Sequence, residues 1–201
     1  MCLDLPLFGA VVSLENFGKV MYNKSENLML KTTFEMKVKI LFSDLDGTII
    51  ETKSGATFPK DADDWKFKDL ILEAIASYAP THLHIVSNQG GVKKGYFTAM
   101  ELYKKMHRIA GRLINLLPNV SVSFDYCTSL DKNDKRRKPN TGMLEHFYNM
   151  TSYEKKDALM IGDASGKEGD FSDSDKKCAE NFGIEYMDVN DFIKAYGRTG
   201  S

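Results

Sequence analysis

The sequence predicts a Rossmann-like, three-layer α/β fold, in which a parallel sheet carries helices on both of its faces. From residue 38 onward, strand-like apolar runs alternate with amphipathic segments, a pattern that implies a parallel sheet. The first run, VKILFSD (38–44), has no polar alternation, as expected for a strand covered on both faces. Three of the runs end in a polar residue: Asp44, Ser87 and Asp163. Ligands of parallel sheets bind at the carboxyl ends of the strands, where these residues lie.

The segments after the first strand continue the alternation. Residues 65–79 have helical apolar spacing, with an acidic lead at 63–64 and a stop at Pro80, and they predict a helix. HLHIVSN (82–88) predicts the second strand. Residues 98–117 then predict a long helix with one apolar face.

The second half of the domain repeats this order. VSVSFDYC (120–127) alternates like a third strand, and residues 141–149 predict a short helix. ALMIGD (158–163) predicts a fourth apolar strand. Residues 174–182 predict a helix with an acidic first turn and a glycine stop, and residues 183–197 a last short strand and helix.

Length and composition indicate one ordinary globular domain. The chain has 201 residues, of which 42% are hydrophobic and 27% charged. Residues 1–36 show no clear period and are expected to be an N-terminal lead-in, with residues 37–201 forming the domain. The formal net charge of −1 argues against a broadly basic nucleic-acid coat but permits a local basic groove.

The cysteines and the N-terminus indicate a soluble intracellular protein. Three isolated cysteines without metal spacing suit a reducing compartment. The apolar N-terminal run is too short to span a bilayer and lacks the basic start of a signal peptide. We expect a cytoplasmic location, or a nuclear one in a nucleated cell, and no membrane partner.

The stretch DLDGT (44–48) places two carboxylates at the end of the first strand. A calcium loop of the EF-hand type would need glycine at its sixth position and glutamate at its twelfth, where this chain has Ile49 and Gly55. That interpretation fails. An ordinary Asp-Gly turn remains open from these residues alone, beside a catalytic role.

Three further motifs follow other predicted strands. They are SNQGG (87–91), RRKPNTGM (136–143) and IGDASGKEGDFSDSD (161–175). Together with DLDGT they place aspartates, a serine, a lysine and a further aspartate in this order along the chain. The chain thereby resembles the haloacid dehalogenase superfamily of phosphohydrolases, which implies a haloacid dehalogenase-like fold and phosphate-ester chemistry.

The resemblance implies a role for each motif residue. Asp44 would attack phosphorus and form an aspartyl-phosphate. Asp46 would protonate the leaving alkoxide and later deprotonate the attacking water. Ser87 and Lys138 would bind the transferring oxygens, and Thr48 would order the loop at the substrate.

The resemblance also implies a Mg²⁺ cofactor. Asp44, Asp163 and the backbone carbonyl of Asp46 would hold it through oxygen atoms, which Mg²⁺ prefers. Asp175 is expected to support the site by orienting the side chain of Asp163 or Lys138. Three other acids compete for that supporting role (Glu168, Asp170 and Asp173), and a simple helix N-terminal acid remains an alternative for Asp175.

A narrower resemblance concerns the substrate. The intervals between the motifs leave no room for a large cap domain, so the site should be open and suit a polymeric substrate. Together with SGATFP (54–59) and DDW (63–65), the motifs look like the phosphatase domain of the polynucleotide kinase 3′-phosphatases and their stand-alone DNA relatives. Lys94 and Arg137 match positions where that family places basic contacts to DNA phosphates. The alternative for both residues is a solvated surface charge. Asn88 is also expected to bind substrate.

The sequence therefore predicts a monomeric, Mg²⁺-dependent phosphatase that acts on DNA 3′-phosphate ends. No ATP-binding P-loop is present, so kinase activity is not expected. One alternative is a small-molecule phosphatase of the histidinol-phosphate or heptose-bisphosphate type, although their Cys/His zinc loop has only Cys127 to match it. Another is a non-catalytic module that binds phosphorylated nucleic-acid ends, which would not need both Asp44 and Asp46.

Overall fold

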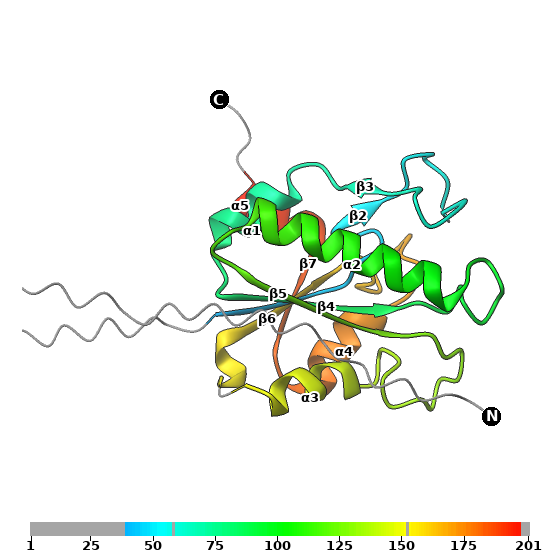
Figure 1. Cartoon of the computed structure of the whole chain (residues 1–201). Coiled ribbons are helices and arrows are strands. Elements are labelled where there is room, and N and C mark those ends of the chain that lie inside the picture. Colours follow the sequence, from blue (N-terminus) through cyan, green and yellow to red (C-terminus); the bar gives the residue numbers. More distant parts are fainter. Residues whose placement is uncertain (1–38, 58, 152, 198–201) are drawn as a thin grey trace, which may run out of the picture. The chain divides into compact units, whose positions relative to one another are not determined.

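A five-stranded parallel sheet in the order β5-β4-β1-β6-β7 forms the centre of the computed structural model (Figure 1). The structure describes residues 39–57, 59–151 and 153–197, and the predicted lead-in (1–36) lies outside them. The strands match the predicted runs closely: β1 Ile40–Ser43, β4 His82–Asn88, β5 Ser121–Cys127, β6 Ala158–Gly162 and β7 Glu185–Asp188.

Helices cover both faces of this sheet, which confirms the predicted three-layer fold (Figure 1). One face carries α1 (Ile71–Tyr78), α2 (Ala99–Leu116) and α5 (Val189–Tyr196). The other carries α3 (Gly142–Asn149) and α4 (Ser174–Phe182). A 3₁₀ turn, Lys155–Asp157, leads into β6.

The central strand β1 belongs to both cores because successive side chains point to opposite faces. Leu41 packs with α1 and α2, whereas Ile40 and Phe42 pack with α3 and α4. The Phe42 ring meets Phe147 of α3 edge-on, with 5.6 Å between centroids. This double burial explains why the run showed no polar alternation.

Helix α2 forms where the sequence predicts it. Thr98 and Glu101 make a reciprocal capping box at its start, which satisfies two backbone N–H groups. Its predicted apolar face is fully buried against the sheet through Leu102, Ile109 and Leu113. The cap and the buried stripe together make α2 a fixed support at one edge of the site.

The predicted helix 65–79 differs from the structure, since α1 begins only at Ile71. Lys66–Phe67 instead forms the short strand β3, antiparallel to β2 (Ile50–Glu51). Leu70 has a left-handed backbone (φ 60°), which a helix cannot pass through, and Phe67 packs on Trp65 at 5.7 Å.

No cap domain interrupts the described fold. Only the β2–β3 hairpin stands between β1 and α1, and only α2 between β4 and β5. The carboxyl rim of the sheet therefore has no lid among the described elements. None of the helices in the described ranges combines the length and apolar character needed to cross a bilayer.

Candidate active site

The candidate site lies where the chain leaves three adjacent strands, β4, β1 and β6. Parallel pairing sets Ser43 level with Ile85 of β4 and Ile161 of β6. Asp44 follows directly, and its backbone N–H donates to the Ile161 carbonyl at 3.0 Å. The residue predicted as nucleophile is thus fixed at the middle of the rim.

A buried lysine reaches Asp44 from the loop before α3. Lys138 Nζ lies 2.6 Å from Asp44 Oδ1 and 2.8 Å from Asp175 Oδ1. The Asn88 amide accepts from the Lys138 N–H at 3.0 Å and donates to its carbonyl at 2.9 Å. The side-chain amide of Asn88 thus holds the lysine loop in place, and its contact with substrate stays a prediction.

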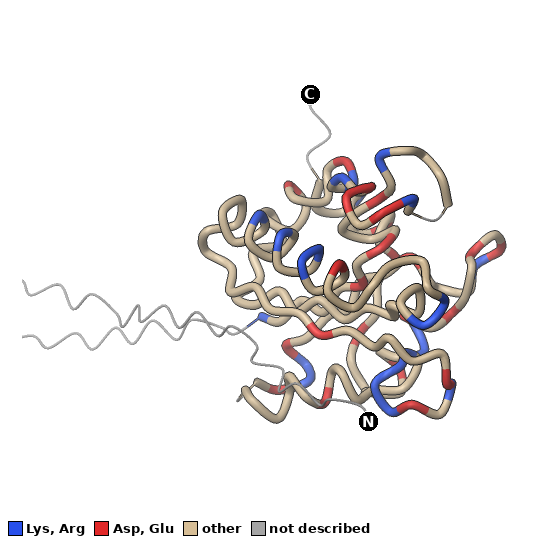
Figure 2. The backbone as a smooth tube through the Cα atoms, turned by 45° about the vertical axis from the view of Figure 1, so that its right-hand side comes forward, with Lys and Arg blue, Asp and Glu red and all other residues tan. Residues whose placement is uncertain are grey.

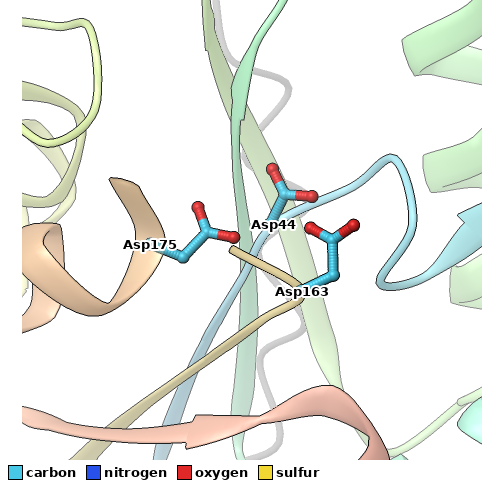
Figure 3. Close-up of side chains that lie close together, drawn as sticks. All are labelled: Asp44, Asp163 and Asp175. Atoms are coloured by element: carbon cyan, nitrogen blue, oxygen red, sulfur yellow. The ribbon is translucent and has the colours of Figure 1, made fainter. Parts of the chain in front are cut away.

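Three carboxylates meet beside this lysine. Asp44, Asp163 and Asp175 each offer an oxygen atom within 4.8 Å of the other two. Figure 3 shows them coming from the ends of β1 and β6 and from the first turn of α4. Gly47 permits this approach, since it has φ +86° and a Cβ there would overlap the Asp163 carboxylate. Such an oxygen-only set fits a hard cation such as Mg²⁺.

The charges in this cluster do not balance. Burial, partly offset by Lys138 and reinforced by Asp175 and Asp163, raises the pKa of Asp44 to about 8. Burial and then the Asp175 charge raise the pKa of Asp163 to about 6. Burial opposes the charge of Lys138, but Asp175 and Asp44 outweigh it and hold its pKa above the usual range. Lys138 pairs with two of the three carboxylates, and the charge of Lys68 offsets the raised pKa of Asp163 only in part. A divalent cation would offset the remaining negative charge.

Asp46 has partners that were not predicted from the sequence. Lys105 of α2 places Nζ 3.0 Å from Asp46 Oδ1. Gln89 Nε2 donates to the other oxygen, Oδ2, and also to the hydroxyl of Ser87 at 2.7 Å. Gln89 therefore bridges the predicted acid–base residue and the predicted hydroxyl donor.

The sequence held a signal for each missed residue. Gln89 lies inside the SNQGG motif, between residues that were singled out. Lys105 follows Leu102 by three positions and precedes Ile109 by four, so it falls on the apolar face of α2. A charged residue on such a face needs a partner, and Asp46 is the one that the structure supplies.

Thr48 lies in the turn that follows β1, but its side chain does not reach the protein surface. Its side chain is fully buried, and within the described ranges Oγ1 has no hydrogen-bond partner. Its backbone N–H donates to the Leu45 carbonyl at 3.3 Å. The structure therefore gives Thr48 a place in the turn and no exposed atom for substrate.

The two predicted basic contacts lie in loops at the same rim, where Figure 2 shows basic and acidic positions interleaved. Lys94 is exposed in the loop after β4, with its ammonium 5.9 Å from the centroid of the Tyr96 ring. Arg137 is half-buried and donates to the Ser129 carbonyl at 2.7 Å. The structure thus puts both in loops that follow the carboxyl ends of strands, and the contacts it shows for them are to Tyr96 and Ser129.

Comparison with known proteins finds similarity to several phosphatases. The family model described as "Polynucleotide kinase 3 phosphatase" matches residues 39–193. The "Bifunctional polynucleotide phosphatase/kinase" of Schizosaccharomyces pombe is 36% identical over 77% of this chain and 37% of its own length. A "Probable D-glycero-D-manno-heptose-1,7-bisphosphate 7-phosphatase" of Thermoplasma acidophilum is 26% identical over 76% of this chain and 91% of that protein.

A solved structure shares the architecture. The D,D-heptose 1,7-bisphosphate phosphatase of B. bronchiseptica, complexed with magnesium and phosphate, superposes with a TM-score of 0.59 at 22% identity. The match covers 74% of this chain and 79% of that one. At this identity the match shows that the two proteins share a fold.

Proposed function

Because the chain belongs to the polynucleotide kinase 3 phosphatase family, we propose that it removes 3′-phosphate groups from DNA ends as a phosphoric monoester hydrolase. The observation that carries this proposal is the Asp44–Lys138–Asp175 arrangement within the region that the family model matches. It provides a nucleophile beside a buried cation at an open rim of the sheet.

Asp44 performs the first step in this proposal. Lys138 binds Oδ1, and the other carboxylate oxygen attacks phosphorus as the ester P–O bond breaks. Lys138 also stabilises negative charge on the transferring oxygens, and the buried Ser87 hydroxyl binds them at the end of β4. The product is an aspartyl-phosphate and a leaving alkoxide.

Asp46 carries the protons. It gives one to the leaving alkoxide, which departs as the DNA 3′-hydroxyl. It then takes one from the water that attacks the aspartyl-phosphate, so that phosphate leaves and Asp44 is restored. Its side chain is 45% exposed, which leaves it open toward an incoming substrate.

Mg²⁺ is part of the proposal. Asp44, Asp163 and the backbone carbonyl of Asp46 would hold it, and it would neutralise charge as an anionic nucleophile meets an anionic ester. Asp175 keeps Lys138 in place through the 2.8 Å ion pair and accepts from the Ala164 N–H. The raised pKa values of Asp44 and Asp163 support a cation there, since the protein alone leaves these carboxylates poorly compensated.

Three observations support DNA as the substrate. They are the family match, the bifunctional relative of Schizosaccharomyces pombe, and a rim without a cap among the described elements. Lys94 and Arg137 lie in rim loops that a phosphate backbone would pass. The heptose-bisphosphate relative favours a small phosphorylated sugar as the second candidate substrate.

The test compares substrates in one assay. Phosphate release is measured with Mg²⁺ from a 3′-phosphorylated oligonucleotide, a 5′-phosphorylated one, histidinol phosphate and a heptose bisphosphate. We expect release from the 3′-phosphorylated oligonucleotide, and none after Asp44→Asn or with a chelator. Release from a small metabolite alone would reject the DNA substrate, and activity that survives Asp44→Asn would reject the mechanism.

A further inference from the structure

Lys105 is a buried cation on the apolar face of α2. The side chain is only 4% exposed, and it follows Leu102 and precedes Met106 in the stripe that packs on the sheet. Burying an ammonium group costs free energy unless a charged or polar partner compensates it. Apolar residues at this position would pack without that cost, so the lysine calls for a reason beyond packing.

The partner of Lys105 is the residue assigned to move protons. Lys105 Nζ contacts Asp46 Oδ1 at 3.0 Å, while Gln89 Nε2 donates to Asp46 Oδ2. The two donors come from different elements, α2 and the end of β4. They fix both oxygens of the carboxylate, and hence its plane and position.

We propose that Lys105 is a positioning residue, which holds Asp46 where it can protonate the leaving group. This inference rests on the proposed function for the role of Asp46. A general acid must lie within hydrogen-bond reach of the atom that it protonates, and a displacement of about 1 Å can cost about 100-fold in rate. Helix α2, with its capping box and buried stripe, is a rigid base for such a contact.

The test exploits leaving groups that differ in their need for a proton. Nitrophenolate departs from p-nitrophenyl phosphate as a stable anion, whereas the alkoxide of glycerol 2-phosphate needs a general acid. The ratio kcat/KM is measured for both esters, because it reports the steps up to leaving-group departure. The variants are Lys105→Met, Asp46→Asn as the reference, and Lys104→Met as the matched control, since Lys104 is the exposed neighbour on α2.

We expect Lys105→Met to lower kcat/KM for the alkyl ester by about tenfold or more, and for p-nitrophenyl phosphate by less than about twofold. Lys104→Met should change neither value. The retained activity on p-nitrophenyl phosphate also reports that the variant is folded. If Lys105→Met does not fold, Lys105→Gln, which keeps a polar group at this position, is put through the same comparison.

Equal losses on both esters, or no loss on either, would overturn the role of Lys105. A selective loss on the alkyl ester with Asp46→Asn but not with Lys105→Met would overturn only this inference. If Asp46→Asn itself shows no selective loss, the acid role of Asp46 in the proposed function fails instead. Both esters are small, so the comparison holds whether or not DNA is the substrate.

Discussion

Asp175 lies 2.8 Å from the ammonium of Lys138, and both side chains are almost completely buried. The two residues come from different segments, the first turn of α4 and the loop before α3. Because Asp175 also accepts from the Ala164 N–H, it ties the lysine to the loop that follows β6. Asp175 therefore pairs with the lysine and is also one of the three clustered carboxylates.

We therefore expect Asp175→Asn to lower kcat on p-nitrophenyl phosphate by about 10–100-fold, as is typical when a supporting partner of an active-site group is lost. The matched control is Asp173→Asn, which removes a partly exposed acid of the same helix end that pairs with Lys177. Equal losses in the two variants would contradict a specific role for Asp175.

Gly47→Ala should abolish activity, because the added methyl group would overlap the Asp163 carboxylate. Gly55→Ala is the matched control, since Gly55 also has positive φ but nothing within 4 Å of an added Cβ. Both substitutions carry the same backbone strain of about 1 kcal/mol or more, read from urea unfolding. Only Gly47→Ala should lose phosphate release. An active Gly47→Ala variant would mean that Asp163 tolerates displacement.

Millimolar Mg²⁺ should raise the melting temperature of the unaltered chain, because a ligand that binds only the folded state stabilises it by about 2.7 kcal/mol at a hundredfold excess over Kd. Asp163→Asn removes one carboxylate of the cluster and should lose most of the shift. Asp191→Asn, at an exposed position of α5, should keep it. A shift that persists in Asp163→Asn would place the cation elsewhere.

The free energy of unfolding should fall as the pH drops below about 6.5, in part because of His84. Burial lowers the pKa of His84 to about 3. Between this pH and about 6.5, the unfolded state therefore binds a proton that the folded state does not. This group contributes its full stability above 6.5 and loses up to about 1.4 kcal/mol per pH unit below it.

Urea unfolding at pH 7, 6 and 5 isolates the contribution of His84 when compared with His84→Gln. The variant should show the shallower slope, because Gln does not titrate. His107→Gln, on the partly exposed side of α2, should keep the slope of the unaltered chain. Parallel slopes for the unaltered chain and His84→Gln would mean that other groups set the acid sensitivity.

Lys94→Gln should raise KM for a 3′-phosphorylated oligonucleotide and leave that for p-nitrophenyl phosphate unchanged. A lysine that neutralises one phosphate contributes about one to the slope of log affinity against log salt, so the salt dependence should flatten by that amount. Lys156→Gln, before β6 at the opposite end of the sheet, is the control. Unchanged salt dependence in Lys94→Gln would leave Lys94 as a solvated surface charge.

The fold could be predicted because its signals are local. The unbroken apolar run of β1, the apolar spacing of α2 and the glycine after α4 each act within one element. The late start of α1, at Ile71 within the predicted helix 65–79, could not be foreseen in the same way. Trp65 and Phe67 follow a helical period, and the left-handed Leu70 and the pairing of β3 with β2 separate them from α1.

The same distinction between local and long-range signals applies to the residues of the site. Asp44, Ser87 and Asp163 lie at or just after strand ends, so their place at one rim followed from parallel topology. Lys138 instead reaches Asp44 from the loop before α3. The partner of Asp46 comes from the middle of a helix, and the contact with Lys105 depends on how α2 lies across the sheet. Sequence spacing contains no information on that placement, and only the misplaced charge on an apolar face hinted at it.

The central position of β1 has a consequence for how the protein is made. Ile40 pairs with His82 on one side and with Ala158 on the other, so the second edge of β1 is covered only once β6 has been made. A ribosome releases β6, Asp163 and Asp175 after most of the domain. The nascent chain therefore carries Asp44 before Asp163 and Asp175 have been made, and one edge of β1 stays unpaired during that interval.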